Sequence, residues 1–154
     1  MSIAMTRWAC SECWSLDGLL LPTDVFIPLD GSPEAGYRAA SSVLLAELLS
    51  RGDGDWVEVD PFCRCRDESR GILVEAGGGS LETEGFVAVS DAGGLMWVLH
   101  LYDSEAFTAV RVEGDEVVAV AEEYPFRNEF RIPITDPSRL RVRSKNLASP
   151  PHGE

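Results

Sequence analysis

Basic residues and histidine are scarce in this chain. Its 154 residues contain 13 Lys and Arg against 26 Asp and Glu, with only 2 histidines, and the formal net charge at pH 7 is −13. A chain this acidic repels phosphate groups, which disfavours direct binding to nucleic acid and to anionic membranes. We therefore expect its partners to be neutral or cationic.

Long apolar runs are also missing. Runs such as Leu95–Leu99 and Leu19–Leu21 are far shorter than the roughly 20 residues that a membrane-spanning helix needs. Residues 1–13 lack the basic start and the apolar stretch of a signal peptide. We therefore predict a cytoplasmic protein without membrane contact, in which cysteines stay reduced rather than forming structural disulfides.

The chain has no recognisable catalytic motif. The glycine stretches Gly77–Gly79 and Gly93–Gly94 match neither the P-loop nor the dinucleotide-binding pattern. His100 is the only histidine in the expected core, where a hydrogen-bonded structural role is more typical than general-base catalysis. Adjacent carboxylates such as Glu122 and Glu123 face opposite ways on a strand, so they do not form an acid–base dyad. We predict that the protein is not an enzyme.

One segment carries helix signals. Ser32 can cap an N-terminus, Pro33 fits the first helical position, and apolar residues recur at steps of three and four as far as Leu48. Arg51 and Gly52 then supply a cation and a left-handed end. The pattern predicts one principal helix at about 33–51.

Alternating apolar and polar residues predict short strands over most of the remaining chain. The predicted strands cover residues 56–60, 72–76, 85–90, 95–102, 106–113, 116–122, 128–134 and 139–143. Gly114 and Asp115 are favoured in a two-residue turn, which predicts a hairpin of the strands on either side. Residues 95–102 are apolar on both faces, as in a central strand. Pro133 cannot donate to a ladder, which predicts an edge strand or a bulge there.

These elements indicate an α+β fold, with a mainly antiparallel twisted sheet of about six to eight strands packed on the one principal helix. A chain of this length buries enough surface for a single core. Without repeats or linkers, residues 1–143 form one domain, and residues 144–154 form a flexible polar tail. An open sheet and a closed ligand-binding barrel are both compatible with this pattern.

Four cysteines form the one pattern with metal-ligand spacing. Cys10 and Cys13 make a C-x2-C pair, and Cys63 and Cys65 make a C-x-C pair. Four thiolates arranged tetrahedrally hold structural zinc, so a four-cysteine zinc site is one hypothesis. The alternative is two unrelated pairs of reduced thiols that pack as small hydrophobes. No other cofactor is indicated.

Acidic residues are concentrated in residues 71–123, where Arg111 is the single basic residue. Carboxylates gathered on turns and outward strand positions steer a cationic partner, and aromatic side chains beside them are typical interface anchors. We expect Arg139, Arg141, Arg143 and Lys145 to pair with part of this charge. The predicted partner-binding residues are Glu113, Asp115, Glu116, Glu122, Glu123, Tyr124 and Phe126.

The segment from Phe107 to Ile134, FTAVRVEGDEVVAVAEEYPFRNEFRIPI, resembles in general style the bacterial polymorphic-toxin immunity proteins. This resemblance implies a stoichiometric protein-binding function, in which the protein occludes the active site of a toxin's effector domain, often a basic nuclease. It implies no residue-specific roles. The alternatives are a zinc-stabilised structural or regulatory module and an acidic inhibitor that mimics nucleic acid.

Overall fold

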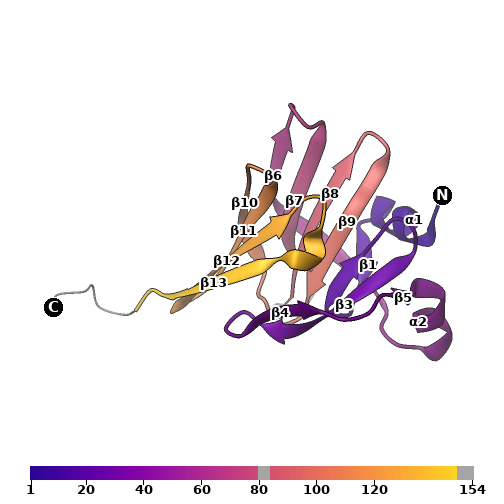
Figure 1. The fold of residues 1–154 in the computed structure, drawn as a ribbon, viewed down its shortest axis with the longest axis horizontal. Helices are drawn as coiled ribbons and strands as arrows, with labels where there is room; N and C mark the ends of the chain where they lie inside the picture. The colour runs from indigo at the N-terminus through magenta and orange to yellow at the C-terminus, as the bar shows by residue number, and fades with distance from the viewer. Residues whose placement is uncertain (80–83, 149–154) are drawn as a thin grey trace.

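Strands in two antiparallel sheets make up most of the chain in a computed structural model, which describes residues 1–79 and 84–148 (Figure 1). The larger sheet contains β1 (Glu12–Trp14), β2 (Gly18–Leu20), β3 (Val25–Ser32), β4 (Gly36–Ala39), β5 (Val43–Leu44), β6 (Trp56–Asp67), β7 (Ile72–Gly79), β8 (Gly85–Asp91) and β9 (Gly94–Leu101). The smaller sheet contains β10 (Phe107–Glu113), β11 (Glu116–Glu123), β12 (Phe126–Pro133) and β13 (Arg141–Asn146). The helices are α1 (Ile3–Ala9) and α2 (Leu45–Arg51), and a 3-10 turn, η1, spans Pro137–Arg139.

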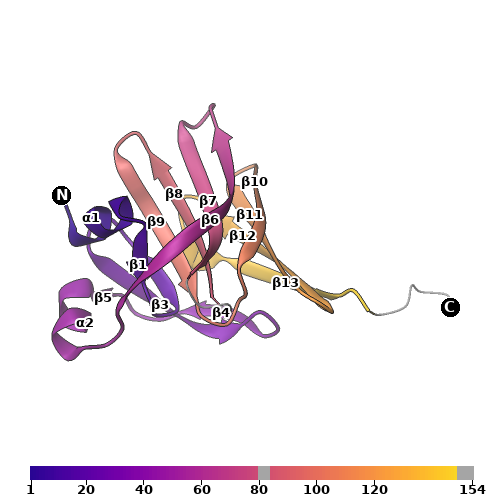
Figure 2. The same ribbon diagram turned by 180° about the vertical axis from the view of Figure 1, so that it is seen from behind.

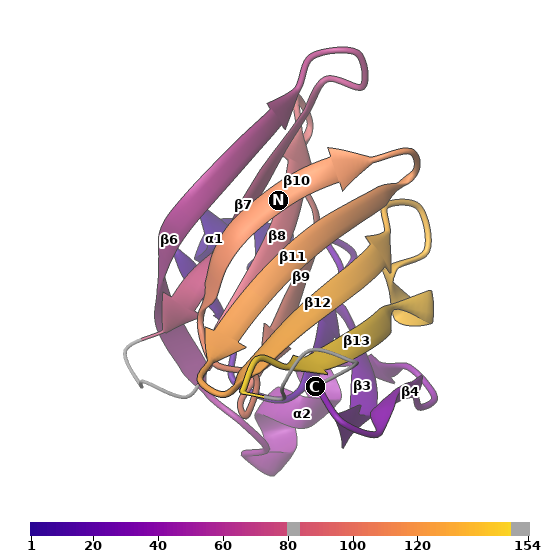
Figure 3. The same cartoon turned by 90° about the vertical axis from the view of Figure 1, so that its left-hand side faces the viewer.

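The order of the larger sheet is β1-β6-β7-β8-β9-β2-β3-β4, with β5 paired to β3, and that of the smaller sheet is β10-β11-β12-β13. The smaller sheet lies across one face of the larger one (Figure 3). Both helices lie on the other side of the larger sheet (Figures 1 and 2). The molecule is therefore layered, with two sheets and an incomplete helical layer.

The main core fills the space between the two sheets. Alternate residues of β7, β8 and β9 point toward alternate residues of β11 and β12, as the two-residue period of strands requires. The rings of Phe107 and Phe130 meet edge-on with centroids 5.0 Å apart. Trp97 of β9 donates its indole N–H to the carbonyl of Ile134, which follows β12, at 2.8 Å. This buried hydrogen bond ties one sheet to the other.

A second core lies on the opposite face of the larger sheet, beneath the helices. Phe86 and Ala88 of β8 and Val98 of β9 pack there with Leu45 and Leu48 of α2. The intervening residues of β8 and β9 face the main core. These two strands are therefore buried on both faces, which confirms the prediction of a central strand at 95–102.

The predicted helix at 33–51 is wrong over most of its length. Residues from Ser32 to Gly36 form the turn between β3 and β4, and the Ser32 hydroxyl accepts a hydrogen bond from the N–H of Ala35. A serine that caps a helix and a serine that closes a turn make the same kind of bond, so the sequence signal has two meanings. Within this segment only α2 is helical, and Gly52 closes it in the left-handed conformation with φ of 72°.

The described residues form more strands than the six to eight predicted, and a second helix, α1. The strands that were missed are β1 to β5. Three of them, β1, β2 and β5, have only two or three residues each, too few to produce a recognisable alternation. The longer β3 is buried without regular alternation, and β4 lies within the segment predicted as a helix. Residues 144–146 belong to β13 rather than to the predicted tail, and residues 149–154 lie outside the described part. The predicted hairpin is confirmed, because Glu113 pairs with Glu116 across Gly114 and Asp115.

The prediction for Pro133 is wrong. Its strand, β12, pairs with β11 on one side and β13 on the other, so it is not an edge strand. Pro133 is the last residue of β12, and the pairing with β13 extends only to Arg131. The missing N–H therefore costs no hydrogen bond to β13.

Neither described helix is long enough to cross a membrane.

Phe107→Ala should lower the free energy of unfolding by about 3–5 kcal/mol, because the ring is fully buried against Phe130 and its loss leaves a cavity. Urea denaturation followed by circular dichroism measures this change. Phe62→Ala is the control, since that ring is 58% exposed and its removal should change the free energy by less than about 0.5 kcal/mol. Equal losses for the two variants would contradict the assignment of Phe107 to the core.

Candidate interaction surface

The four cysteines are distributed over both faces of the larger sheet. Cys13 on β1 is buried in the core beneath the helices, whereas Cys63 and Cys65 on β6 pack against the core between the sheets. Cys10, at the end of α1, is exposed. Within residues 1–79 and 84–148, no group of three or more His, Cys, Asp or Glu is placed to hold a metal ion. The arrangement gives the hypothesis of a four-cysteine zinc site no support.

An irregularity in β6 accounts for this separation. The pairing of β6 with β7 shifts by one residue between Pro61 and Cys63, as at a β-bulge. Val59, before the shift, faces the helix-side core, and Cys63, after it, faces the other core. Because the side-chain period of a strand is two, one extra residue reverses the faces. The C-x-C pair is therefore turned away from Cys13.

The predicted acidic residues of the β10–β11 turn are neutralised by arginines. Arg131 lies 3.4 Å from Glu113, and Arg141 lies 2.6 Å from Glu116. Arg111 donates a hydrogen bond to Glu113 that holds the pKa of this carboxyl below its ordinary value. Asp115 pairs with a further arginine, Arg70, from the β6–β7 turn, at 3.3 Å. Their negative field is thus largely cancelled at short range.

The seven predicted partner-binding residues do not form one surface. Glu113, Asp115 and Glu116 lie at one end of β11, and the other four lie around its opposite end. The two ends are separated by the length of β11, roughly 24 Å at the usual rise of a strand. Of the predicted basic stripe, Arg141 forms an ion pair with Glu116, whereas Arg139, Arg143 and Lys145 form none with described residues.

The β11–β12 turn presents exposed aromatic side chains. Tyr124 is 78% exposed and Phe126 is 40% exposed, as the prediction of a loop at this point requires. Glu122 lies 3.5 Å from Arg127, while Glu123 forms no ion pair within the described residues. This turn is therefore both apolar and negatively charged, unlike the β10–β11 turn.

The loop between β9 and β10 lies at the same end of the sandwich (Figure 3). Phe107, the first residue of β10, pairs with Ala121 near the end of β11, so the preceding loop arrives beside the β11–β12 turn. Tyr102 of this loop is 48% exposed, and Asp103 is exposed without an ion pair to any described residue. We define the aromatic–acidic end as Tyr102, Asp103, Glu122, Glu123, Tyr124 and Phe126.

A hollow of about 500 Å³ adjoins this end, and we call it the Tyr102 hollow. Tyr102 and Asp103 form one side of it, and Asp17, Asp30 and buried apolar side chains form the rest. Sequence reasoning missed this hollow because its walls come from four segments that are distant along the chain. No spacing or motif connects them.

His100 is a core residue, as predicted. Its Nε2 lies 2.7 Å from an Oε atom of Glu84, and its Nδ1 lies 3.3 Å from the carbonyl oxygen of Leu16. Both side chains are almost completely buried on the helix side of the sheet. A buried pair of this kind holds β8, β9 and the β1–β2 connection together, and it has no open path to a substrate.

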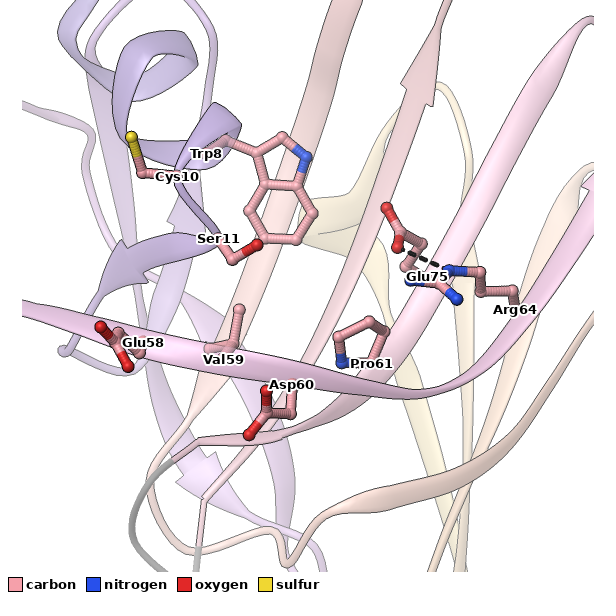
Figure 4. A pocket seen from close by; sticks show the side chains of 9 residues that line it. All are labelled: Trp8, Cys10, Ser11, Glu58, Val59, Asp60, Pro61, Arg64 and Glu75. Carbon is pink, nitrogen blue, oxygen red and sulfur yellow. Dashed lines mark hydrogen bonds and ion pairs between the residues drawn. The ribbon is translucent and has the colours of Figure 1, made fainter.

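A second hollow, of about 390 Å³, lies between the end of α1 and strands β6 and β7 (Figure 4). Arg64 and Glu75 form an ion pair of 2.9 Å at one side of it. The sulfur of Cys10 points away from the hollow, and Glu58 projects from the side of β6 opposite Trp8 (Figure 4). The polar groups here do not converge on a common point.

Comparison of the chain with protein-family models, curated proteins and solved structures gave no match. The function must therefore be argued from the chemistry of the surface.

The thiols should differ widely in their reaction with Ellman's reagent at pH 8. Burial, with a contribution from Glu84, raises the pKa of Cys13 far above its ordinary value, and burial also raises the pKa of Cys63. A raised pKa lowers the thiolate fraction, so exposed Cys10 should react first and Cys13 only after unfolding.

The control for this experiment is Cys10→Ser, which should remove the fast phase of thiol labelling and leave the slower labelling of the other cysteines. Rapid labelling of Cys13 in the folded protein would contradict its placement. One tightly held zinc ion per chain after purification would contradict the separation of the four cysteines.

Proposed function

We propose that this protein acts by stoichiometric binding of a basic protein partner, and that the aromatic–acidic end is the contact surface. The observation that carries the proposal is the exposure of Tyr102, Tyr124 and Phe126 on two neighbouring turns beside carboxylates that lack a cation among the described residues. Aromatic side chains in that situation are the usual anchors of protein interfaces.

The aromatic residues supply the affinity in this proposal. Tyrosine and phenylalanine bury a large area while losing only two side-chain rotations, so they are efficient contact residues. Leu147 is also exposed, and its N–H donates to the carbonyl of Pro125 at 2.6 Å, which brings it to the same turn. The apolar part of the surface therefore extends from Tyr124 to the residue after β13.

The carboxylates attract the cationic partner during association. Those of the β10–β11 turn are paired with arginine, whereas Asp103 and Glu123 have no such pair among the described residues, and these two carboxylates supply the negative field of the aromatic–acidic end. Burial raises the pKa of Tyr37 well above its ordinary value, and the nearby Asp17 and Asp103 carboxylates add to the rise. Such a field speeds association with a cationic protein and weakens as salt is added.

The partner class in this proposal is a basic effector, as the resemblance to immunity proteins implies. An enzyme that acts on nucleic acid needs a cationic surface to hold phosphates. A rigid acidic end that docks there would block the same surface without any chemical step. Inhibition by occlusion is therefore the mode of action that we assign.

The test is capture of the partner by the full-length chain, followed by kinetic measurement with the purified partner. We expect a basic protein at one copy per chain. Glu123→Lys should slow its association about tenfold at low salt, because the charge that steers it is reversed. Tyr124→Ser combined with Phe126→Ser should raise the dissociation constant about thirtyfold or more, which corresponds to about 2 kcal/mol.

Matched controls come from the rest of the surface. Asp115→Lys reverses a charge whose side chain is 96% exposed at the opposite end, and Phe62→Ser removes an exposed ring elsewhere. Both should leave the kinetics within about a factor of two. An acidic partner, or equal sensitivity to Asp115→Lys and Glu123→Lys, would refute the proposal.

A further inference from the structure

The Tyr102 hollow has an apolar floor that is fixed by the two cores. Phe26 and Leu48 belong to the core beneath the helices, and Leu29 belongs to the core between the sheets. All three line the hollow while being almost completely buried. Such a floor cannot collapse without disturbing the cores, so the hollow is preformed in the free protein.

Three carboxylates surround this floor. Asp17, Asp30 and Asp103 line the hollow, and none of them forms an ion pair with a described residue. Asp17 is held in place because its Oδ1 accepts a hydrogen bond from the N–H of Tyr102 at 2.6 Å. Arg38 stands opposite Asp30 in the β3–β4 register but forms no ion pair with it. The rim therefore has acceptors for a cation that the described chain does not supply.

The ring of Tyr102 adds an aromatic wall at the open side. It lines the hollow and remains about half exposed. A planar cation can lie against such a ring while it donates to carboxylates at its edge. An apolar floor, an aromatic wall and acceptors at the rim match the three parts of an arginine side chain, namely its methylene stem, its flat face and its N–H edge.

We infer that the Tyr102 hollow binds the guanidinium group of an arginine side chain that the basic partner inserts. The inference rests on the proposed function, because it takes the partner to be a cationic protein. It goes further by naming the group that is recognised. Asp103 and Tyr102 belong both to the hollow and to the aromatic–acidic end, so one docked partner reaches both.

Arginine is favoured over lysine by the geometry of the donors. A guanidinium presents several N–H groups in one plane and donates to two carboxylates at once, whereas an ammonium is a strongly hydrated point charge. The carboxylates come from the β1–β2 connection, from β3 and from the β9–β10 loop, so they approach from different directions. A branched, planar donor satisfies such a set better than a single point charge.

The test uses a small probe and the full-length protein. N-acetyl-arginine N-methylamide is titrated into 15N-labelled protein, and its neutral isostere, N-acetyl-citrulline N-methylamide, is titrated in parallel. We expect saturable shifts of the amide signals of Leu16, Tyr102 and Asp103 with the arginine compound alone. Asp30→Asn and Asp103→Asn should each weaken binding about fivefold or more, because each removes one charge without changing the shape.

Asp115→Asn is the matched control, since it removes a carboxylate at the opposite end and should leave the titration unchanged. Binding of the citrulline compound with the same affinity would overturn the inference. Equal weakening by Asp115→Asn and Asp103→Asn would also overturn it, because it would show general attraction to an acidic surface. Self-association of the chain that Asp103→Asn abolishes would overturn the assignment to a partner, because the arginine would then come from a second copy.

The variant Asp30→Asn separates this inference from the proposed function. Asp30 lines the hollow but is not part of the aromatic–acidic end. If a captured partner depends on Tyr124 and Glu123 but binds Asp30→Asn as tightly as the original protein, the arginine site is wrong and the proposed function stands. If no basic partner is captured while the arginine probe still binds, the proposed function is wrong and the site is real.

Discussion

Burial of β8 and β9 on both faces is the constraint on which the rest of this structure depends. One face packs against the smaller sheet and the other against α2 and the N-terminal segment, so both cores are built on these two strands. Transfer of apolar area from water stabilises such a layered arrangement by roughly 25 cal/mol per Å². The faces of the central strands are consequently fully used, and binding must use other parts of the surface.

The turns at the two ends of the sandwich have different neighbouring side chains. At the β10–β11 end, arginines from three other segments surround the carboxylates. At the opposite end aromatic rings are exposed, and Glu122 pairs with Arg127, while Asp103 and Glu123 have no ion pair among the described residues. The two turns thus differ in their surroundings, and this difference is the basis of the proposed contact surface. The fold separates the ends by the length of a strand, so neither turn compensates the other.

The sequence predicted the C-terminal half of the fold well and the N-terminal half poorly, for a physical reason. Strands from β7 to β12 are seven or eight residues long, and their alternation is clear without any knowledge of partners. Ser32 and Pro33 carry a local signal that suits a turn and a helix equally, and it is resolved by the pairing of β3 with β4 and, through β2, with the distant β9. The pairing of Glu113 and Glu116 with Arg131 was equally invisible, because it depends on strand register.

The one-residue shift in β6 also determines how that strand responds to a change of length. Pro61 and Cys63 already pair with the consecutive residues Gly77 and Ala76 of β7, so removal of Phe62 would delete only the extra residue and leave both halves of β6 with their present faces. Removal of Arg64 would instead turn Cys65 toward the helices and drive Arg66 into the space between the sheets. A deleted codon in β6 is therefore tolerated best at the irregularity itself.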